Sequence, residues 1–85
     1  MSNRERMVVA FREKLAARRA LGAAMVRFNF TLRARARNKT EQSCSEHAAA
    51  LRAHAEAVRE DQRCSRELAL ARNKLQQEFV AKRGV

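Results

Sequence analysis

The stretch TLRARARNKTEQ, Thr31 to Gln42, contains the best candidate for a break in an otherwise continuous helical sequence. Its alternating arginines suit the last turn of a helix, where the backbone dipole presents partial negative charge. Asn38 and Lys39 follow, and Thr40 can cap a second helix that has Glu41 in its first turn. We therefore expect two long helices, at about residues 4–37 and 41–82.

Composition supports an all-α chain on both sides of this break. The 85 residues include no proline and only two glycines, and good helix formers dominate the rest. Much of the 46% hydrophobic content is alanine, and a chain this short buries little surface. We expect a single small helical unit, a hairpin or an extended pair, that is ordered in part by its partners.

Local signals place the helix starts. Ser2 or Asn3 can cap the first helix, with Glu5 favourably placed in its first turn. Ser43 with Glu46 three residues later offers the second helix an alternative capping box.

The net charge of +10 is concentrated in the first half of the chain. Residues 1–39 hold eleven Lys and Arg against two acids, whereas residues 40–85 hold eight against seven. We therefore expect a basic helix within 1–39 and a charge-balanced helix within 40–85. A field of this kind attracts nucleic acid, anionic lipid or acidic protein surfaces. The predicted polyanion-binding residues are Arg33, Arg35, Arg37 and Lys39.

Phe28 and Phe30 could stack on RNA bases beside these arginines. Alternatively, the long arginine stems cover a protein surface. The same charge argument allows residues 4–32 to lie on a membrane surface, although their apolar face has no Trp. No uncharged stretch approaches the ~18–20 residues of a membrane span, so we expect no transmembrane segment.

Apolar residues of the first helix recur mostly at intervals of three and four, which is helical spacing. They are Met7, Val8, Phe11, Leu15, Leu21, Met25, Phe28 and Leu32. Arg18 and Asn29 interrupt a strict heptad, which disfavours a long symmetrical coiled coil. Gly22 indicates a close approach to another backbone.

The second helix has two narrow apolar stripes. The first is Cys44, Ala48, Leu51, Ala55 and Val58, and the second is Cys64, Leu68, Ala71, Leu75 and Phe79. Charged residues fill the opposite face, which we interpret as solvated.

Cysteine and histidine residues do not form a recognisable reactive or metal site. Cys44 and Cys64 are about 30 Å apart on one helix, too far for a disulfide. His47 and His54 are about 10 Å apart, whereas ligands of one zinc converge at about 2.0–2.3 Å. Phosphate loops, nucleophile elbows and carboxylate pairs are lacking. We expect neither catalysis nor a cofactor or metal.

The stretch ELALARNKL, Glu67 to Leu75, resembles a helix of the cilia- and flagella-associated protein 141-like small inner proteins of ciliary doublet microtubules. The resemblance implies a non-enzymatic helical protein wedged against tubulin and neighbouring helical proteins in the axoneme of a cilium or flagellum. It marks Glu67, Leu68, Leu70 and Leu75 as contact candidates.

These features predict a small structural subunit of a large assembly, with acidic tubulin surfaces facing the arginines. The predicted partner-docking residues are Phe11, Leu15, Phe28, Leu32, Glu67, Leu68, Leu70, Leu75 and Phe79. The alternative is an RNA-contacting subunit of a ribonucleoprotein such as a mitochondrial ribosome, which would place the chain in the mitochondrion.

Overall fold

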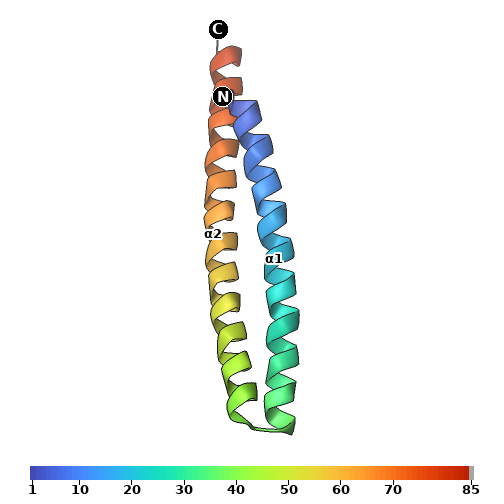
Figure 1. The fold of residues 1–85 in the computed structure, drawn as a ribbon. Helices are drawn as coiled ribbons and strands as arrows, with labels where there is room; N and C mark the ends of the chain where they lie inside the picture. The colour runs from blue at the N-terminus through green and yellow to red at the C-terminus, as the bar shows by residue number, and fades with distance from the viewer. Residues whose placement is uncertain (85) are drawn as a thin grey trace.

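A computed structural model describes residues 1–84, which form two long antiparallel helices joined by a short connection (Figure 1). Helix α1 spans Asn3–Arg37 and α2 spans Glu41–Arg83. The two termini lie at the same end, where α2 extends beyond α1 (Figure 1). The pair measures 68 × 17 × 13 Å, so the molecule is a thin rod. The predicted all-α fold is confirmed, and both helices begin and end within one residue of the prediction.

Both helices begin at side-chain caps, as the sequence predicted. The Ser2 hydroxyl accepts a hydrogen bond from the Glu5 backbone N–H at 3.1 Å. At α2, Thr40 accepts from the Ser43 N–H at 3.0 Å, and the Ser43 hydroxyl accepts from the Thr40 N–H at 2.9 Å. The predicted box of Ser43 with Glu46 is therefore wrong, because Ser43 already closes the box that Thr40 opens.

One row of each helix faces the other, and we call these two rows the seam. Along α1 the seam is Asn3, Met7, Ala10, Lys14, Ala17, Leu21, Ala24, Phe28 and Thr31, and every member is buried or half-buried. Along α2 it is Ser43, His47, Ala50, His54, Ala57, Asp61, Cys64, Leu68, Ala71, Leu75 and Glu78, again buried or half-buried. The intervals alternate between three and four throughout, which is the heptad repeat of a coiled coil.

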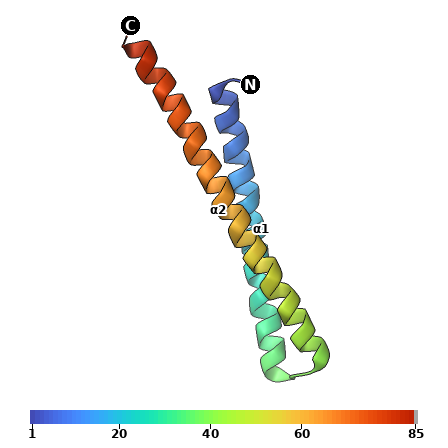
Figure 2. The ribbon, with the colours of Figure 1, turned by 90° about the vertical axis from the view of Figure 1, so that its left-hand side faces the viewer.

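The prediction that Arg18 and Asn29 interrupt a strict heptad is therefore wrong. Arg18 and Asn29 do not interrupt the seam because they lie in the neighbouring row, and both are exposed. Figure 2 shows the two helices crossing as they run, as expected for helices that keep a heptad seam in contact.

Large and small residues alternate across the seam. Thr31 faces His47, with 3.1 Å between Oγ1 and Nδ1, and this contact sets the register of the antiparallel pair. In that register a large residue faces a small one at successive levels: Phe28 faces Ala50, Leu21 faces Ala57, and Met7 faces Ala71. The hydrophobic residues that are buried are therefore all small: Ala10, Ala17, Ala50, Cys64 and Ala71.

Many large apolar residues lie outside the seam. Of the predicted α1 face, Met7, Leu21 and Phe28 are half-buried, whereas Val8, Phe11, Leu15, Met25 and Leu32 are exposed. On α2 the predicted stripe from Cys44 to Val58 is displaced by one row, because His47 and Ala50 take the inward positions. The second predicted stripe coincides with the seam from Cys64 to Leu75, and Phe79 is exposed.

Gly22 was expected to lie close to another backbone, and within residues 1–84 it does not. A Cβ atom placed on Gly22 would meet no atom within 4 Å. The φ angle of Gly22 is not positive either, so its conformation does not require glycine.

A polar layer interrupts the seam near its middle. The Lys14 Nζ lies 2.7 Å from Asp61 Oδ1 and 2.6 Å from the Ser65 hydroxyl oxygen. The side chains of Lys14 and Asp61 are only 16% and 13% exposed. Arg18 reaches the same carboxylate from the exposed side, at 3.5 Å.

Removing one partner of this layer should destabilise the hairpin, whereas removing both should not. Asp61→Ala leaves the Lys14 ammonium half-buried without its carboxylate, which should lower the free energy of unfolding by about 1–3 kcal/mol. The double variant Lys14→Leu with Asp61→Leu should have a free energy of unfolding equal to or greater than that of the parent chain. Urea unfolding followed by circular dichroism at 222 nm measures both effects.

Glu60→Ala is the matched control, because Glu60 forms an exposed ion pair with Arg63 on the same helix. If Asp61→Ala were no more harmful than Glu60→Ala, the buried pair would not exist in solution.

Candidate interaction surfaces

The predicted polyanion-binding residues do not form one cluster. Arg33 and Arg37 are exposed on the outer side of α1, where they line a shallow hollow with Val26 and Phe30. Arg35 is half-buried near the seam, and Lys39 lies exposed in the connection between the helices. Alternate positions of a helix point in different directions, so the run of arginines is divided.

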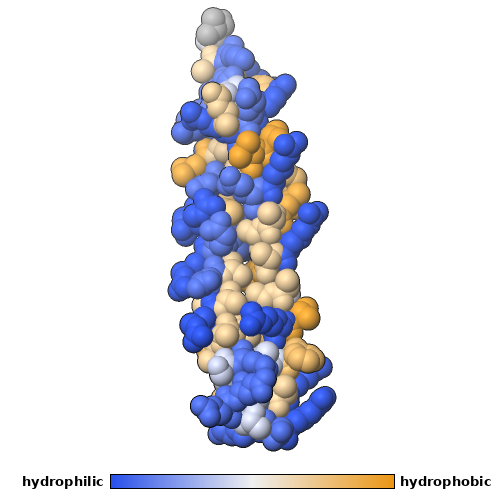
Figure 3. All heavy atoms as spheres, in the orientation of Figure 1, coloured by the Kyte–Doolittle hydropathy of each residue, from blue (hydrophilic) through white to orange (hydrophobic). Residues whose placement is uncertain are grey.

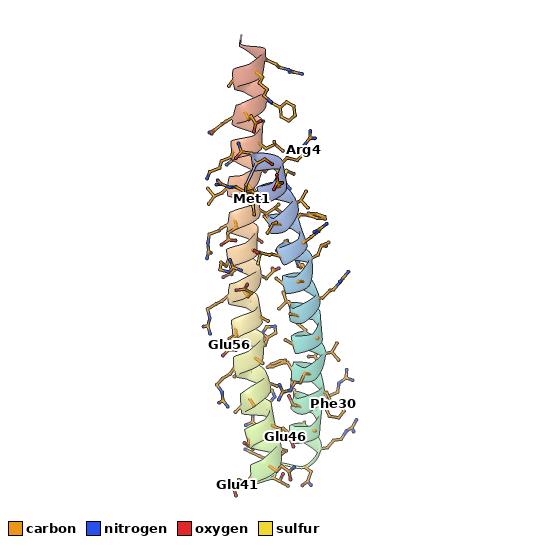
Figure 4. The ribbon with its side chains drawn as sticks, turned by 45° about the horizontal axis from the view of Figure 1, so that its top comes forward. Met1, Arg4, Phe30, Glu41, Glu46 and Glu56 are labelled. Atoms are coloured by element: carbon orange, nitrogen blue, oxygen red, sulfur yellow. The ribbon has the colours of Figure 1, made fainter. Side chains whose placement is uncertain are left out.

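Phe30 is the aromatic residue available beside these arginines. Its side chain is 73% exposed and projects from α1 away from α2 (Figure 4). Phe28, also predicted to stack on bases, is instead half-buried in the seam. Its ring centroid lies 5.1 Å from that of His47 and 5.6 Å from that of His54. We call Val26, Phe30, Arg33 and Arg37 the arginine–phenylalanine patch.

His47 has a structural role in the seam. The Thr31 hydroxyl donates to the Phe28 carbonyl at 3.0 Å, so its oxygen can accept from Nδ1–H of His47. This bond satisfies a polar side chain that is buried between the helices. Within residues 1–84, no group of three His, Cys, Asp or Glu side chains is placed to hold a metal ion.

Most acidic side chains lie along one face of the rod, which we call the acidic face. Arg63 donates to both Glu60 and Glu67, and its Nη2 lies 3.9 Å from a carboxylate oxygen of Glu13. The bonds from Arg63 lower the pKa of the Glu60 carboxyl below its usual value. The remaining members of this face are Glu46 and Glu56. Arg63 is shared among three carboxylates here, so it compensates part of the negative charge of this face within the chain.

The exposed row next to the seam lies on the opposite face, which we call the docking face. On α1 it carries the exposed residues Val8, Phe11, Leu15, Met25 and Leu32, and on α2 it carries Leu51, which is exposed, and Val58, which is half-buried. Equivalent sides of two antiparallel heptad helices lie on the same side of the pair, so the two rows adjoin. The bonds of Lys14 to Ser65 and of Arg18 to Asp61 cross the pair on this side.

Hydrophilic side chains line both outer edges of the rod. Figure 3 shows them on either side of a pale band of small and moderately apolar side chains between the helices. On α1 the outer row carries Arg12, Arg19 and Arg33, and on α2 it carries Arg52, Arg59 and Arg66, all exposed. The edges of the molecule are therefore cationic.

The ELALARNKL stretch divides between the seam and the surface. Leu68 and Leu75 are half-buried against α1, and Glu67 pairs with Arg63. Leu70 is 60% exposed on the acidic face, where it lines a hollow with Val9. Among the docking residues predicted from this part of the chain, Leu70 and Phe79 have the most accessible side chains.

No protein-family model, curated protein or solved structure matches this chain. In the described part of the chain, neither helix is long and apolar enough to cross a membrane. Inferences about function therefore rest on the surfaces of this chain.

The two cysteines should differ in reactivity. Cys44 is half-buried, whereas Cys64 is 2% exposed, and burial raises the pKa of the Cys64 thiol. Because the thiolate is the reactive form, a disulfide reagent such as DTNB at pH 8 should modify Cys44 first. Cys64 should react only as the hairpin opens, at a rate that rises with urea.

The variants Cys44→Ser and Cys64→Ser identify which thiol gives the fast phase and which gives the slow phase of the reaction with DTNB. Because the folded-state pKa of Cys64 lies above the unfolded value, its contribution to stability is complete below about pH 8.5 and is lost as the pH rises further. Equal rates for the two thiols in the folded chain would contradict the burial of Cys64.

Proposed function

We propose that this chain is a small, non-enzymatic helical subunit that packs against acidic helical partners in a larger assembly. The observation that carries the proposal is an inverted distribution of size: the buried hydrophobic residues of the seam are all small, and many large apolar side chains are exposed. Fully burying one Val, Leu, Phe or Met side chain contributes about 1.5–3 kcal/mol. Exposed residues such as Phe11, Leu15 and Met25 therefore offer a partner more apolar stabilisation than the alanines of the seam give the hairpin.

The setting that we propose is the lumen of an axonemal doublet microtubule, with tubulin and neighbouring helical proteins as partners. Three features support it: the rod shape, the net charge of +10 and the resemblance of ELALARNKL to small doublet inner proteins. A thin helical rod can follow a protofilament groove while its cationic edges face acidic tubulin.

A second candidate is an RNA-contacting subunit of a ribonucleoprotein. The arginine–phenylalanine patch favours it, because an exposed aromatic ring beside Arg33 and Arg37 is an arrangement that binds single-stranded RNA.

Crosslinking mass spectrometry on the native assembly tests the setting. We expect crosslinks from Lys74 and Lys82 on α2, and from Lys39 in the connection, to tubulin and to helical neighbours. Crosslinks confined to ribosomal proteins would overturn the axonemal setting. A chain that purifies alone, with full helicity and no retained neighbours, would overturn the proposal of an assembly subunit.

A charge variant separates the two candidates. We expect Arg33→Gln with Arg37→Gln and the matched pair Arg52→Gln with Arg59→Gln to weaken RNA binding equally, because both remove two exposed charges. In the ribonucleoprotein alternative only the first pair has a specific effect, reducing the slope of log affinity against log salt by about 1.4. Fluorescence anisotropy with a labelled single-stranded RNA over a salt series provides the measurement.

A further inference from the structure

The docking face continues along most of α1 as a second heptad row. Val8, Phe11 and Leu15 recur at the intervals of three and four that the seam follows, and Met25 and Leu32 continue the row. From Val8 to Leu32 the row is about 36 Å long at 1.5 Å per residue. A helix with two adjoining heptad rows has the geometry to pack against two other helices, of which α2 is one.

Gly22 lies in this row and has no function within residues 1–84. Its Cβ position is open, and its backbone is ordinary right-handed helix. Glycine inside a helix is destabilising relative to alanine. A glycine here would be explained within the chain only by a close contact at its Cβ position, and the hairpin has no such contact. On an exposed apolar row, a missing side chain provides a notch in which a second backbone can approach closely.

Charge defines the chemistry of the occupant. Among residues 1–84, the only carboxylate in the rows of the docking face is that of Glu41, at the tip of the rod. The cations there include Arg18 and Arg72, and the arginines of the outer edges border both sides. Most other acids lie on the acidic face or in the seam, where Arg63 and Lys14 pair with several of them.

We infer that the docking face binds an acidic amphipathic helix of another protein, which completes a three-helix bundle with α1 and α2. A second copy of this chain packed through the same face does not meet the requirement, because it would bring further arginines opposite Arg18 and Arg72 without carboxylates. The inference rests on the proposed function and adds the face and the chemistry of the partner.

A designed peptide tests the chemistry of the occupant. The probe is a helix of about 28 residues with Leu and Ala at the heptad core positions and Glu elsewhere. A peptide with Lys in place of Glu and a scrambled Glu peptide are the controls. Isothermal titration calorimetry and light scattering should show a one-to-one complex with the Glu helix only. Equal binding of the scrambled peptide would show that net charge alone accounts for the interaction, and it would overturn the inference.

Variants test the position of the face. Leu15→Glu and Met25→Glu should each weaken binding about tenfold or more, because each buries a carboxylate against the apolar face of the acidic helix. Leu70→Glu makes the same change at an exposed leucine of the acidic face and should leave the affinity unchanged. Equal loss in all three variants would overturn the assignment of the face.

Gly22 gives a variant in which stability and binding should change in opposite directions. Gly22→Leu should raise the thermal stability of the free chain, because leucine favours helix, yet weaken binding by filling the notch. Ala23→Leu, at an exposed position on the other side of α1, should leave binding unchanged. Unchanged binding in Gly22→Leu would overturn the close approach.

Two outcomes separate this inference from the proposed function. A free chain that dimerises, and becomes monomeric in Met25→Glu, would assign the face to a second copy. A structure of the native assembly in which the partner contacts only the acidic face would overturn the docking face and leave the structural-subunit proposal intact.

Discussion

Small residues along the seam determine how α1 and α2 meet and how little apolar surface the pair buries. With a small residue opposite most large ones, the two backbones can approach closely and one side chain fills most levels. The hydrophobic contribution to stability scales with the apolar area removed from water, and alanine removes little. The hairpin therefore has a well-defined geometry and a small hydrophobic contribution from its own core.

Polar layers define the register that these small residues leave open. Repeated alanines fit one another at many offsets, because each heptad looks much like the next. Lys14 with Asp61 and Thr31 with His47 make bonds that a shift by one heptad would break. Buried ion pairs are weak sources of net stability, but a polar group at a single level can select one register over another. These layers thus explain why a seam poor in large hydrophobic residues carries charged and polar ones.

Features encoded locally could be predicted from the sequence, and features that depend on the partner helix could not. The break at Asn38 and Lys39 and the cap at Thr40 depend on neighbouring residues, so the helix bounds were predicted closely. The stripe from Cys64 to Leu75 was predicted, but much of the remaining seam was missed because Leu, Phe and Val mark the neighbouring row, while Ala, Lys, Asp and His occupy the inward positions. Gly22 was assigned to a close approach, and within the hairpin the space beside it is open.

The two long faces of the rod differ in how far their charges are satisfied, and this difference bears on what each can do. On the acidic face, Arg63 already pairs with Glu60 and Glu67, so a partner there would compete with bonds that exist. On the docking face, Arg18 has only a long contact to Asp61, and the adjoining apolar side chains are exposed. Burying an apolar row is favourable, while burying unsatisfied cations is costly, so only a helix that supplies carboxylates gains the first without the second. The charge pattern that separates the two faces therefore also selects among partners, because it disfavours self-association of a chain whose apolar surface would otherwise promote it.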